Sequence, residues 1–393
     1  MILLNRLLLV FLCIVVYSWA AYPAIVFIMA FLFSAKKPFY GRAPMASAIR
    51  RSGDPFVSLI VPVHNEQDTI AGKLQNCLEL VYPHDRLEIV VASDRSTDRT
   101  AEIVRRFSAR DPRIRWLESD RRVGKSGVQN LAATRARGDI FFFTDARTGM
   151  PPGALQTMID DLADPRVGLV TATVFFGDPL FSDTEDAVEK GQGFYWRYEL
   201  FLRAAESDLG ILATGSGQAL LVRRELFRPL PACYGDDCIM PLDVRLQGYR
   251  VVQNRRAIVY DTMPHTIEGE LRARIRMTAR NWTGTLSRGA LLNPLRFPLT
   301  SIGLVSHKLL RWLTPFCLAA ILLLSAALFV KGRLFLFLYL QIGFYFSALI
   351  GWRLARKQKP AWLFGYPFSF CLANVGFLLG MVKALRNQKI IAY

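Results

Sequence analysis

Asp145 ends an apolar run, "FFFTDARTG" at residues 141–149, and Arg147 lies where a second acid would complete a pair of metal ligands. Hard divalent cations prefer carboxylate oxygens, and Mg²⁺ needs few of them when phosphate oxygens and water fill its other positions. Arg147 has the planar donor geometry that binds phosphate. The alternative is an acid that caps the turn after a buried strand. We therefore treat Asp145 as a candidate cation ligand.

Two adjacent carboxylates, Asp236 and Asp237, precede a helical pattern in "YGDDCIMPLDVRLQGYRV" at residues 234–251. The apolar positions after them recur at helical spacing. Acids favour the first turn of a helix, so capping is one explanation for the pair. A carboxylate in a cleft can also accept a proton, so a catalytic role is the other.

Four strand-like runs would position these side chains, and helix-patterned segments at 99–107 and 128–136 separate some of them. This alternation predicts an α/β fold with a mostly parallel sheet and helices on both faces. Ligands bind outside the carboxyl ends of the strands in such sheets. Polar residues, including Glu66, Asp94 and Asp145, follow three of the runs and predict one nucleotide-sized cleft. The strand-like runs are 56–65, 87–94, 113–119 and 139–145.

Two familiar phosphate-binding patterns are incomplete. "SDRRVGKSG" lacks the first glycine of a P-loop, because Ser119 stands in its place. That substitution removes the turn that cradles the phosphates. "TGSGQAL" has two glycines of a dinucleotide fingerprint but not the third. The sequence therefore favours neither ATP hydrolysis nor NAD chemistry.

Seven motifs occur in the order found in family 2 membrane glycosyltransferases, the relatives of cellulose, chitin and hyaluronan synthases. The chain resembles that family over roughly residues 55–290. The resemblance implies a GT-A-like fold. It also implies inverting transfer of a sugar from a UDP-sugar to a saccharide or lipid-linked acceptor. The motifs are "VPVHNE", "SDRSTD", "GKSGVQN", "FTDART", "GSGQALLVRRELF", "GDDCIMPLDVRLQGYRV" and "RMTARNW".

The resemblance implies a donor site built from four residues. Pro62 and Glu66 would help to form the nucleotide pocket, Asp94 would face the uracil and ribose, and Lys125 would contact the diphosphate. "SDRSTD" replaces the commoner D-D-G-S-T-D, so Ser93 stands where the first acid would be and Asp94 carries that contact alone.

Two other readings of these residues stay open beside the donor site. Ser96, Thr97 and Asp98 also suit the N-terminus of a helix that begins near Arg99. Lys125 could be a solvated lysine.

The resemblance also assigns the metal ligand and the base. The family's D-x-D pair holds a divalent cation, and here only Asp145 remains, so we expect dependence on Mg²⁺ or Mn²⁺ with weaker affinity. Arg147 takes the second acid's place and could contact phosphate. "GDD" corresponds to the family's T-E-D, so Asp236 replaces the glutamate and Asp237 becomes the general base for the acceptor hydroxyl.

The family's Q-x-x-R-W motif is altered in "RMTARNW", because Asn281 separates Arg280 from Trp282. By resemblance, Arg280 would bind diphosphate and Trp282 would stack on an acceptor sugar. The loss of the adjacent arginine and tryptophan weakens the case for processive synthesis.

The chain is too apolar for an ordinary soluble protein, since 52% of its 393 residues are hydrophobic. Residues 7–33 exceed the roughly 20 residues that a spanning helix needs. Three further candidate spans, 313–330, 334–352 and 361–382, bring the expected number to about four, and a basic segment before them suits an interfacial helix. The expected domains are an anchor at 1–35, a glycosyltransferase domain at 52–290, an interfacial segment at 291–312 and a membrane region at 313–393.

Basic residues flank two of the expected membrane boundaries and predict the orientation. They place residues 42–290 in the cytoplasm and the protein in the inner membrane as a multi-pass enzyme. Lys383, Arg386 and Lys389, after the last expected span, weaken that case. The flanking residues are Lys36, Lys37, Arg42, Arg50 and Arg51 after the first span, and Arg353, Arg356, Lys357 and Lys359 before the last.

The net charge of +17 comes from dispersed basic residues. No recognition helix or zinc-finger spacing is evident, so we expect no nucleic-acid partner. Anionic membrane lipids and phosphate-bearing substrates account for the charge better. The six cysteines form no CxxC pair, which predicts neither disulfides nor a zinc site.

Two alternatives remain at this point. The same fold could transfer one sugar to a polyprenyl phosphate. A protein of another class, an inactive scaffold or a transporter component, would have no need for Asp94, Asp145 and Asp237 together, and few spans are available for transport.

Overall fold

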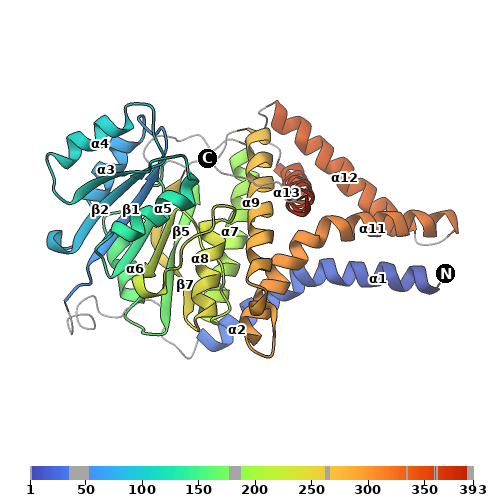
Figure 1. Ribbon diagram of the computed structural model, residues 1–393. Helices are drawn as coiled ribbons and strands as arrows, with labels where there is room; N and C mark the ends of the chain where they lie inside the picture. The colour runs from blue at the N-terminus through green and yellow to red at the C-terminus, as the bar shows by residue number, and fades with distance from the viewer. Residues whose placement is uncertain are drawn as a thin grey trace.

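A seven-stranded sheet with helices on both faces lies beside a group of long apolar helices (Figure 1). The structure is a computed structural model. It describes residues 2–34, 53–176, 187–261, 266–332, 335–357, 359 and 362–386.

The sheet confirms the predicted α/β fold and is mixed but mostly parallel. Its strand order is β3-β2-β1-β4-β6-β5-β7, and β6 alone runs antiparallel to its neighbours. The four predicted strands are β1 to β4, each within two residues of the expected bounds. The strands are β1 Val57–Val63, β2 Leu87–Ser93, β3 Ile114–Glu118, β4 Ile140–Thr144, β5 Val167–Phe176, β6 Ala219–Arg223 and β7 Arg250–Asp261.

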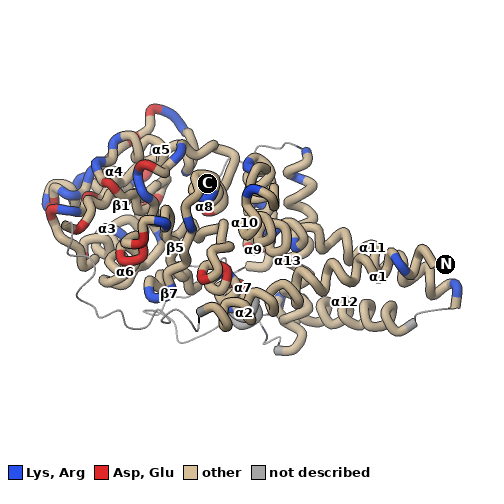
Figure 2. The backbone as a smooth tube through the Cα atoms, turned by 90° about the horizontal axis from the view of Figure 1, so that it is seen from below, with Lys and Arg blue, Asp and Glu red and all other residues tan. Residues whose placement is uncertain are grey.

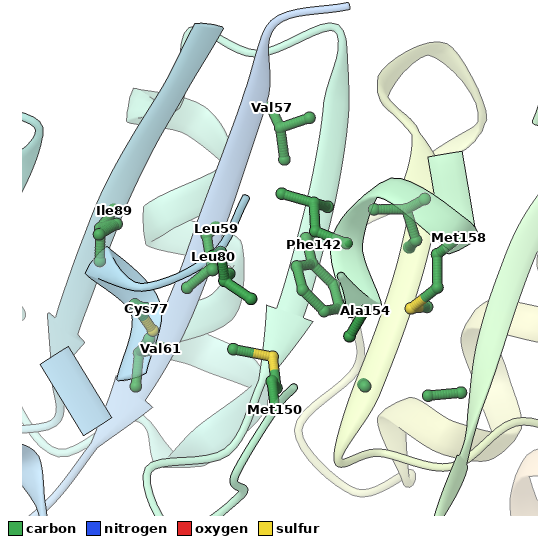
Figure 3. Packing of buried hydrophobic residues seen from close by; sticks show 14 of the residues in the cluster. Val57, Leu59, Val61, Cys77, Leu80, Ile89, Phe142, Met150, Ala154 and Met158 are labelled. Carbon is green, nitrogen blue, oxygen red and sulfur yellow. The ribbon is translucent and has the colours of Figure 1, made fainter. Parts of the chain in front are cut away.

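Helices cover the sheet because the central strands are apolar on both sides. Successive side chains of a strand point to opposite faces. Leu59 and Phe142 therefore join the cluster beneath α3, α4 and α6, whereas Ile60 and Phe143 pack with α5 and α8. Figure 3 shows the first of these layers, with Met150, Ala154 and Met158 beside the strands. The helices of this domain are α3 Ile70–Leu78, α4 Thr100–Ser108, α5 Gly124–Arg135, α6 Ala154–Asp161, α7 Ala187–Asp208, α8 Asp236–Leu246 and α9 Ile267–Ser287, with 3₁₀ turns at His84–Arg86 and Arg224–Leu226.

Helices α1, α11 and α12 extend away from the sheet and carry few charges (Figure 2). Leu8 of α1 packs against Ile321 and Leu328 of α11. Tyr22 and Val26 of α2 instead pack against α7 of the sheet domain. The elements are α1 Ile2–Val16, a π-helical turn Tyr17–Ala21, α2 Tyr22–Ser34, a 3₁₀ turn Gly289–Leu292, α10 Pro298–Gly303, a second π-helical turn Leu304–Leu309, α11 Leu310–Val330, α12 Phe335–Arg356 and α13 Trp362–Leu385.

The expected count of about four membrane spans is corrected to three. Among the described residues, three helices are long and apolar enough to cross a membrane: Ile2–Phe33, Pro298–Val330 and Leu363–Leu385. The fourth expected span forms α12, but Gln341 and Arg353 lower its hydropathy. The glycine and tyrosine residues of α12 also contribute little to the free energy of transfer into a membrane.

The expected interfacial segment is continuous with a long apolar helix. Three of its basic residues pair with the sheet domain: His307, Lys308 and Arg311 bind Glu199 of α7 at 2.9, 2.9 and 3.0 Å. Charge pairing with the sheet domain therefore explains these residues, and the predicted boundary after residue 312 falls inside α11. A location at the membrane interface stays a prediction.

The orientation also stays a prediction. Arg353, Arg356, Lys357 and Lys359 are described, and the two arginines lie in the last turn of α12. The basic residues expected to follow the first span lie outside the described residues, as does Lys389.

Close packing of α13 against α9 joins the apolar helices to the sheet domain. Gly376 and Gly380 lie one turn apart, and their backbones approach Arg274 and Thr278 of α9. A Cβ atom at Gly380 would lie 2.6 Å from the Cβ of Thr278, and one at Gly376 would lie 2.8 Å from the Cβ of Arg274. Small residues at this spacing allow two helices to approach closely.

We expect Gly380→Ala to destabilise the protein by about 1–3 kcal/mol, because the added methyl group forces α13 away from α9. The matched control is Gly343→Ala on α12, where an added Cβ meets no atom within 4 Å. Thermal denaturation of the detergent-solubilised protein measures both. Equal denaturation temperatures for the two variants would contradict the packing argument.

Candidate active site

The predicted polar residues meet where β1, β2 and β4 end. His64 Nδ1 lies 2.9 Å from the backbone oxygen of Asp94, which joins the loops after β1 and β2. The loop after β4 carries Asp145, and the start of α8 brings Asp236 beside it through Lys125. Five segments that are distant in sequence thus form one edge of the sheet, as the strand pattern predicted.

Lys125 connects the two predicted acidic sites. Its Nζ lies 2.7 Å from Oδ1 of Asp145 and 2.9 Å from Oδ2 of Asp236. Burial disfavours the ammonium charge, but the two carboxylates outweigh it and raise the pKa of Lys125. Gln129, one turn later on α5, donates to Asp236 Oδ2 at 2.9 Å. Lys125 is therefore a half-buried, charged member of the site, paired with two carboxylates.

Asp236 and Asp237 have different environments although they are adjacent. Burial favours the neutral form of both. Lys125 and Gln129 overcome that effect and lower the pKa of Asp236. Burial and the negative charge of Asp236 raise the pKa of Asp237, despite Arg280 and Lys125 nearby. Among the described residues no group donates a hydrogen bond to the Asp237 carboxylate. Asp237 is thus the more basic and the more available of the pair.

Helix capping does not account for this acidic pair. The N-cap residue of α8 is Gly235, and no side chain caps the helix there. The carboxylate of Asp236 binds Lys125 and Gln129 and not the first backbone amides. The backbone oxygen of Asp237 accepts from the amide of Gly215, in the loop before β6, at 2.8 Å.

Asp94 has a structural role that the sequence reasoning missed. Its Oδ1 accepts from the amide of Val123 at 2.6 Å, and its Oδ2 accepts from the amide of Gly124 at 3.2 Å and from Arg122 Nε at the same distance. Gly124 has a φ of +74°, which favours glycine. Asp94 is fully buried and holds the start of α5, so it positions Lys125. Its contact with a nucleotide stays a prediction.

Arg147 is paired within the protein. Its Nε lies 3.3 Å from Oε2 of Glu66, and 60% of its side chain is exposed. Glu66 Oε2 also accepts from Thr69 Oγ1 at 2.7 Å. Pro62, the other predicted pocket residue, is buried within β1 opposite Ala92. Arg147 therefore has a partner other than Asp145.

The turn after β2 confirms only part of the predicted cap. Asp98 Oδ1 accepts from the amide of Thr100 at 3.0 Å, at the start of α4. Asn65 Oδ1, from the loop after β1, accepts from the amide of Thr97 at 2.8 Å. Ser96 and Thr97 therefore connect two loops and do not cap the helix.

Arg280 lies beside the acidic pair, but Trp282 lies elsewhere. Arg280 donates to the backbone oxygen of Tyr234, just before α8. The ring of Trp282 packs edge-on against Trp312 of α11, with centroids 6.0 Å apart. Residues two apart on a helix point in nearly opposite directions, about 200° around the axis. The structure therefore does not bring Trp282 together with Arg280.

Lys73 is a further site residue that no sequence signal identified. This buried lysine of α3 donates to Thr144 Oγ1 at 2.8 Å and to the backbone oxygen of Thr148 at 2.7 Å. Burial lowers its pKa, although Asp145 opposes that effect. Lys73 thereby holds both ends of the loop that carries Asp145. In the sequence, Lys73 belongs to an ordinary amphipathic helix pattern. Its role follows only from the tertiary packing of α3 against the loop after β4.

Comparison with known proteins identifies the family of the sheet domain. Residues 58–230 match the profile described as "Glycosyl transferase family 2". Residues 58–230 therefore form a glycosyl transferase family 2 domain. The resemblance seen in the sequence motifs is therefore confirmed.

Curated relatives of this family 2 protein include enzymes that transfer N-acetylglucosamine. It is 27% identical to an N-acetylglucosaminyltransferase of Rhizobium meliloti (strain 1021), over 66% of this chain and 63% of that protein. It is 25% identical to a poly-beta-1,6-N-acetyl-D-glucosamine synthase of Staphylococcus aureus (strain MSSA476), over 56% of this chain and 53% of that protein. The chain thus spans somewhat less than two thirds of the length of these relatives.

A solved structure shares the whole fold. The mannosyltransferase PcManGT from Pyrobaculum calidifontis, in complex with GDP-Man and Mn²⁺, matches with a TM-score of 0.72 and 24% identity. The match covers 97% of this chain and 99% of that one. This similarity shows that the family 2 protein has the same GT-A-like arrangement of sheet and long helices.

The residues of the candidate site suit a divalent cation for which a substrate supplies some of the ligands. The described residues hold no group of three or more His, Cys, Asp and Glu side chains placed to bind a metal. Asp145 and Asp236 nevertheless face one another across the Lys125 ammonium. Mg²⁺ is commonly held by one or two carboxylates, with phosphate oxygens and water as its other ligands. Asp145, whose side chain is 34% exposed, fits that role.

Proposed function

We propose that this protein is a membrane-bound inverting glycosyltransferase that uses a UDP-sugar and extends a saccharide or lipid-linked acceptor. Asp237 carries the proposal: a carboxylate with a raised pKa and no hydrogen-bond donor among the described residues, beside a cluster that can bind phosphate. The family match supports the reaction class. The N-acetylglucosamine named for two relatives supports a hexosamine donor and a role in polysaccharide synthesis.

Asp237 would accept the proton of the acceptor hydroxyl as its oxygen attacks the anomeric carbon. The bond from that carbon to the donor diphosphate breaks, and UDP leaves with the electron pair. Lys125, held by Asp94 and Asp236, would lie beside the developing negative charge. A Mg²⁺ or Mn²⁺ ion on Asp145 would supply further neutralisation of that charge when bound. Lys73 would keep the Asp145 loop in place.

Transfer to the phosphate of a polyprenyl phosphate is the alternative within the same fold. A phosphate oxygen is already ionised near neutral pH, so such an acceptor would need no proton acceptor. The available carboxylate of Asp237 therefore favours a hydroxyl. An inactive scaffold, the alternative of another class, would require no free carboxylate in the cleft.

The decisive experiment incubates purified protein with a panel of labelled nucleotide sugars, with and without Mg²⁺ or Mn²⁺, in membranes that contain native acceptors. We expect label to move from a UDP-sugar to a membrane-extractable product. Transfer from no nucleotide sugar would refute the proposed function. Transfer only to added polyprenyl phosphate would support the alternative acceptor.

We expect the sheet domain to face the cytoplasm. A Cys introduced at exposed Ala109, in a variant that lacks the exposed Cys13 and Cys233, should resist a membrane-impermeant maleimide in intact cells and react after permeabilisation. The reason is the basic flanking residues, which are retained on the cytoplasmic side. Rapid labelling in intact, sealed cells would reverse the assigned orientation.

A further inference from the structure

Three arginines of α9, Arg272, Arg276 and Arg280, recur every fourth residue, and none of them forms an ion pair with a described residue. Arg272 and Arg276 are exposed and make no hydrogen bond or ion pair with any described residue. Arg280, the third, donates to the backbone oxygen of Tyr234, while its buried Nε has no partner. Residues four apart on a helix are neighbours, and like charges at that spacing destabilise the helix. A bound anion would relieve this repulsion.

The arginine stripe faces away from the apolar helices and toward the candidate base. Arg274 and Thr278, which contact Gly376 and Gly380 of α13, lie about 200° around the helix axis from Arg276 and Arg280. An α-helix with side chains is about 10–12 Å wide. One face of α9 therefore contacts a candidate membrane span, while the other presents cations roughly one helix diameter away.

Asp237 lies close to the same end of the stripe. A Cβ atom at Gly235 would lie 2.4 Å from Oδ1 of Asp237 and 3.0 Å from Oδ1 of Asn281, which places the carboxylate beside α9. The partial burial of its guanidinium group and the charge of Arg280 lower the pKa of Arg276, and the negative charge of Asp237 opposes them. The Asp237 carboxylate is thus within electrostatic range of both guanidinium groups.

Under the proposed function, Lys125 is the cation beside the donor diphosphate, in place of the Arg280 contact that the resemblance implied. Lys125 lies with Asp145 and Asp236 at the edge of the sheet. Arg280 acts electrostatically on both Asp236 and Asp237, and Arg276 lies one helical turn farther along α9. Asp237 therefore lies within electrostatic range of Lys125 on α5 and of Arg280 on α9.

We propose that Arg276 and Arg280 bind the phosphate of a lipid-linked saccharide, so that the acceptor is anionic and enters from the membrane side. The proposal rests on the proposed function and names its acceptor class. The acceptor phosphate is not consumed: a hydroxyl of its sugar loses the proton to Asp237 and bonds to the anomeric carbon as UDP departs. Guanidinium groups bind phosphate oxygens through paired, charge-assisted hydrogen bonds, which fix the acceptor's position.

The test compares two probes in detergent by thermophoresis: a polyprenyl diphosphate carrying one N-acetylglucosamine, and the same sugar on a neutral alkyl chain. The wild type should bind the phosphate-bearing probe at least about tenfold more tightly, and Arg276→Gln should remove about tenfold of that preference. Arg276→Lys should retain part of it, since a charge remains without the planar fork. Arg105→Gln on α4, with the same change of charge at an exposed position, should leave it intact.

Three results would overturn this inference. Equal binding of the two probes by the wild type would exclude an anionic acceptor site. A loss of UDP affinity in Arg276→Gln, measured by calorimetry, would assign the stripe to the donor diphosphate. Displacement of the probe by phosphatidylglycerol vesicles, but not by phosphatidylcholine vesicles, would assign it to bulk lipid headgroups. Failure of transfer from every nucleotide sugar would refute the proposed function without changing these binding results.

Discussion

Asp237→Asn should lower the rate of sugar transfer by about 10²–10⁴-fold, the usual contribution of a general base, with little change in UDP affinity. The asparagine keeps the size of the side chain and removes its ability to accept the proton. Lys125, Asp145 and Asp236 remain to bind the donor. Transfer assays at saturating donor, together with calorimetry of UDP binding, separate the two effects.

Asp243→Asn is the matched control, because Asp243 lies on the same helix and binds Arg288 outside the acidic cluster. It should lower stability and leave the turnover of folded protein near normal. The pH profile gives a second readout. The pKa of Asp237 is raised, so the carboxylate takes up a proton at a higher pH than an ordinary aspartate does. As the pH is lowered, wild-type turnover should therefore begin to fall earlier than it would with an ordinary aspartate as the base. Near-normal turnover of Asp237→Asn would show that the base lies elsewhere.

Asp145→Ala should abolish the dependence of UDP binding on Mg²⁺ or Mn²⁺. In the wild type, added metal should tighten UDP binding, because Asp145 would help to hold an ion that neutralises the diphosphate charge. Calorimetry of UDP binding across a metal titration measures this directly. The variant also leaves Lys125 with Asp236 alone, so binding without metal reports the contribution of the ammonium. UDP binding that ignores metal in the wild type would exclude a metal-assisted donor site.

Arg147→Asp tests the altered metal motif within the same titration. The substitution replaces a cation that pairs with Glu66 by an acid near Asp145, so the apparent metal affinity should rise several-fold. The pairing with Glu66 is the structural reason to expect this, since Arg147 is already neutralised within the protein. A lower transfer rate at saturating metal would instead show that Arg147 stabilises the leaving group.

The strand pattern was sufficient to predict four of the seven strands and the edge at which the polar residues gather. Continuous apolar runs that end in polar residues identify buried parallel strands, since neither face of such a strand contacts water. β1 and β4 fit this description, with Phe142 and Phe143 buried on opposite faces. Local patterns of this kind need no knowledge of distant residues.

The length of the apolar runs did not establish what the basic residues beside them contact. His307, Lys308 and Arg311 gave the pattern of an interfacial helix, yet they bind Glu199, more than 100 residues earlier in the chain. A charged residue beside an apolar run is compatible with a lipid surface or with a buried partner. Only the packing of α7 against this segment distinguishes the two.

Residue types indicated which groups could do chemistry, whereas tertiary structure assigned their partners. Lys125 lies 20 residues before Asp145 and 111 before Asp236, and no spacing rule predicts that one ammonium joins them. Asp94 was expected to face a nucleotide, but its carboxylate also accepts hydrogen bonds from the backbone amides at the start of α5, the helix that carries Lys125. The reason is physical: hydrogen bonds and ion pairs act over about 3 Å, so their partners depend on where the folded backbone brings distant segments.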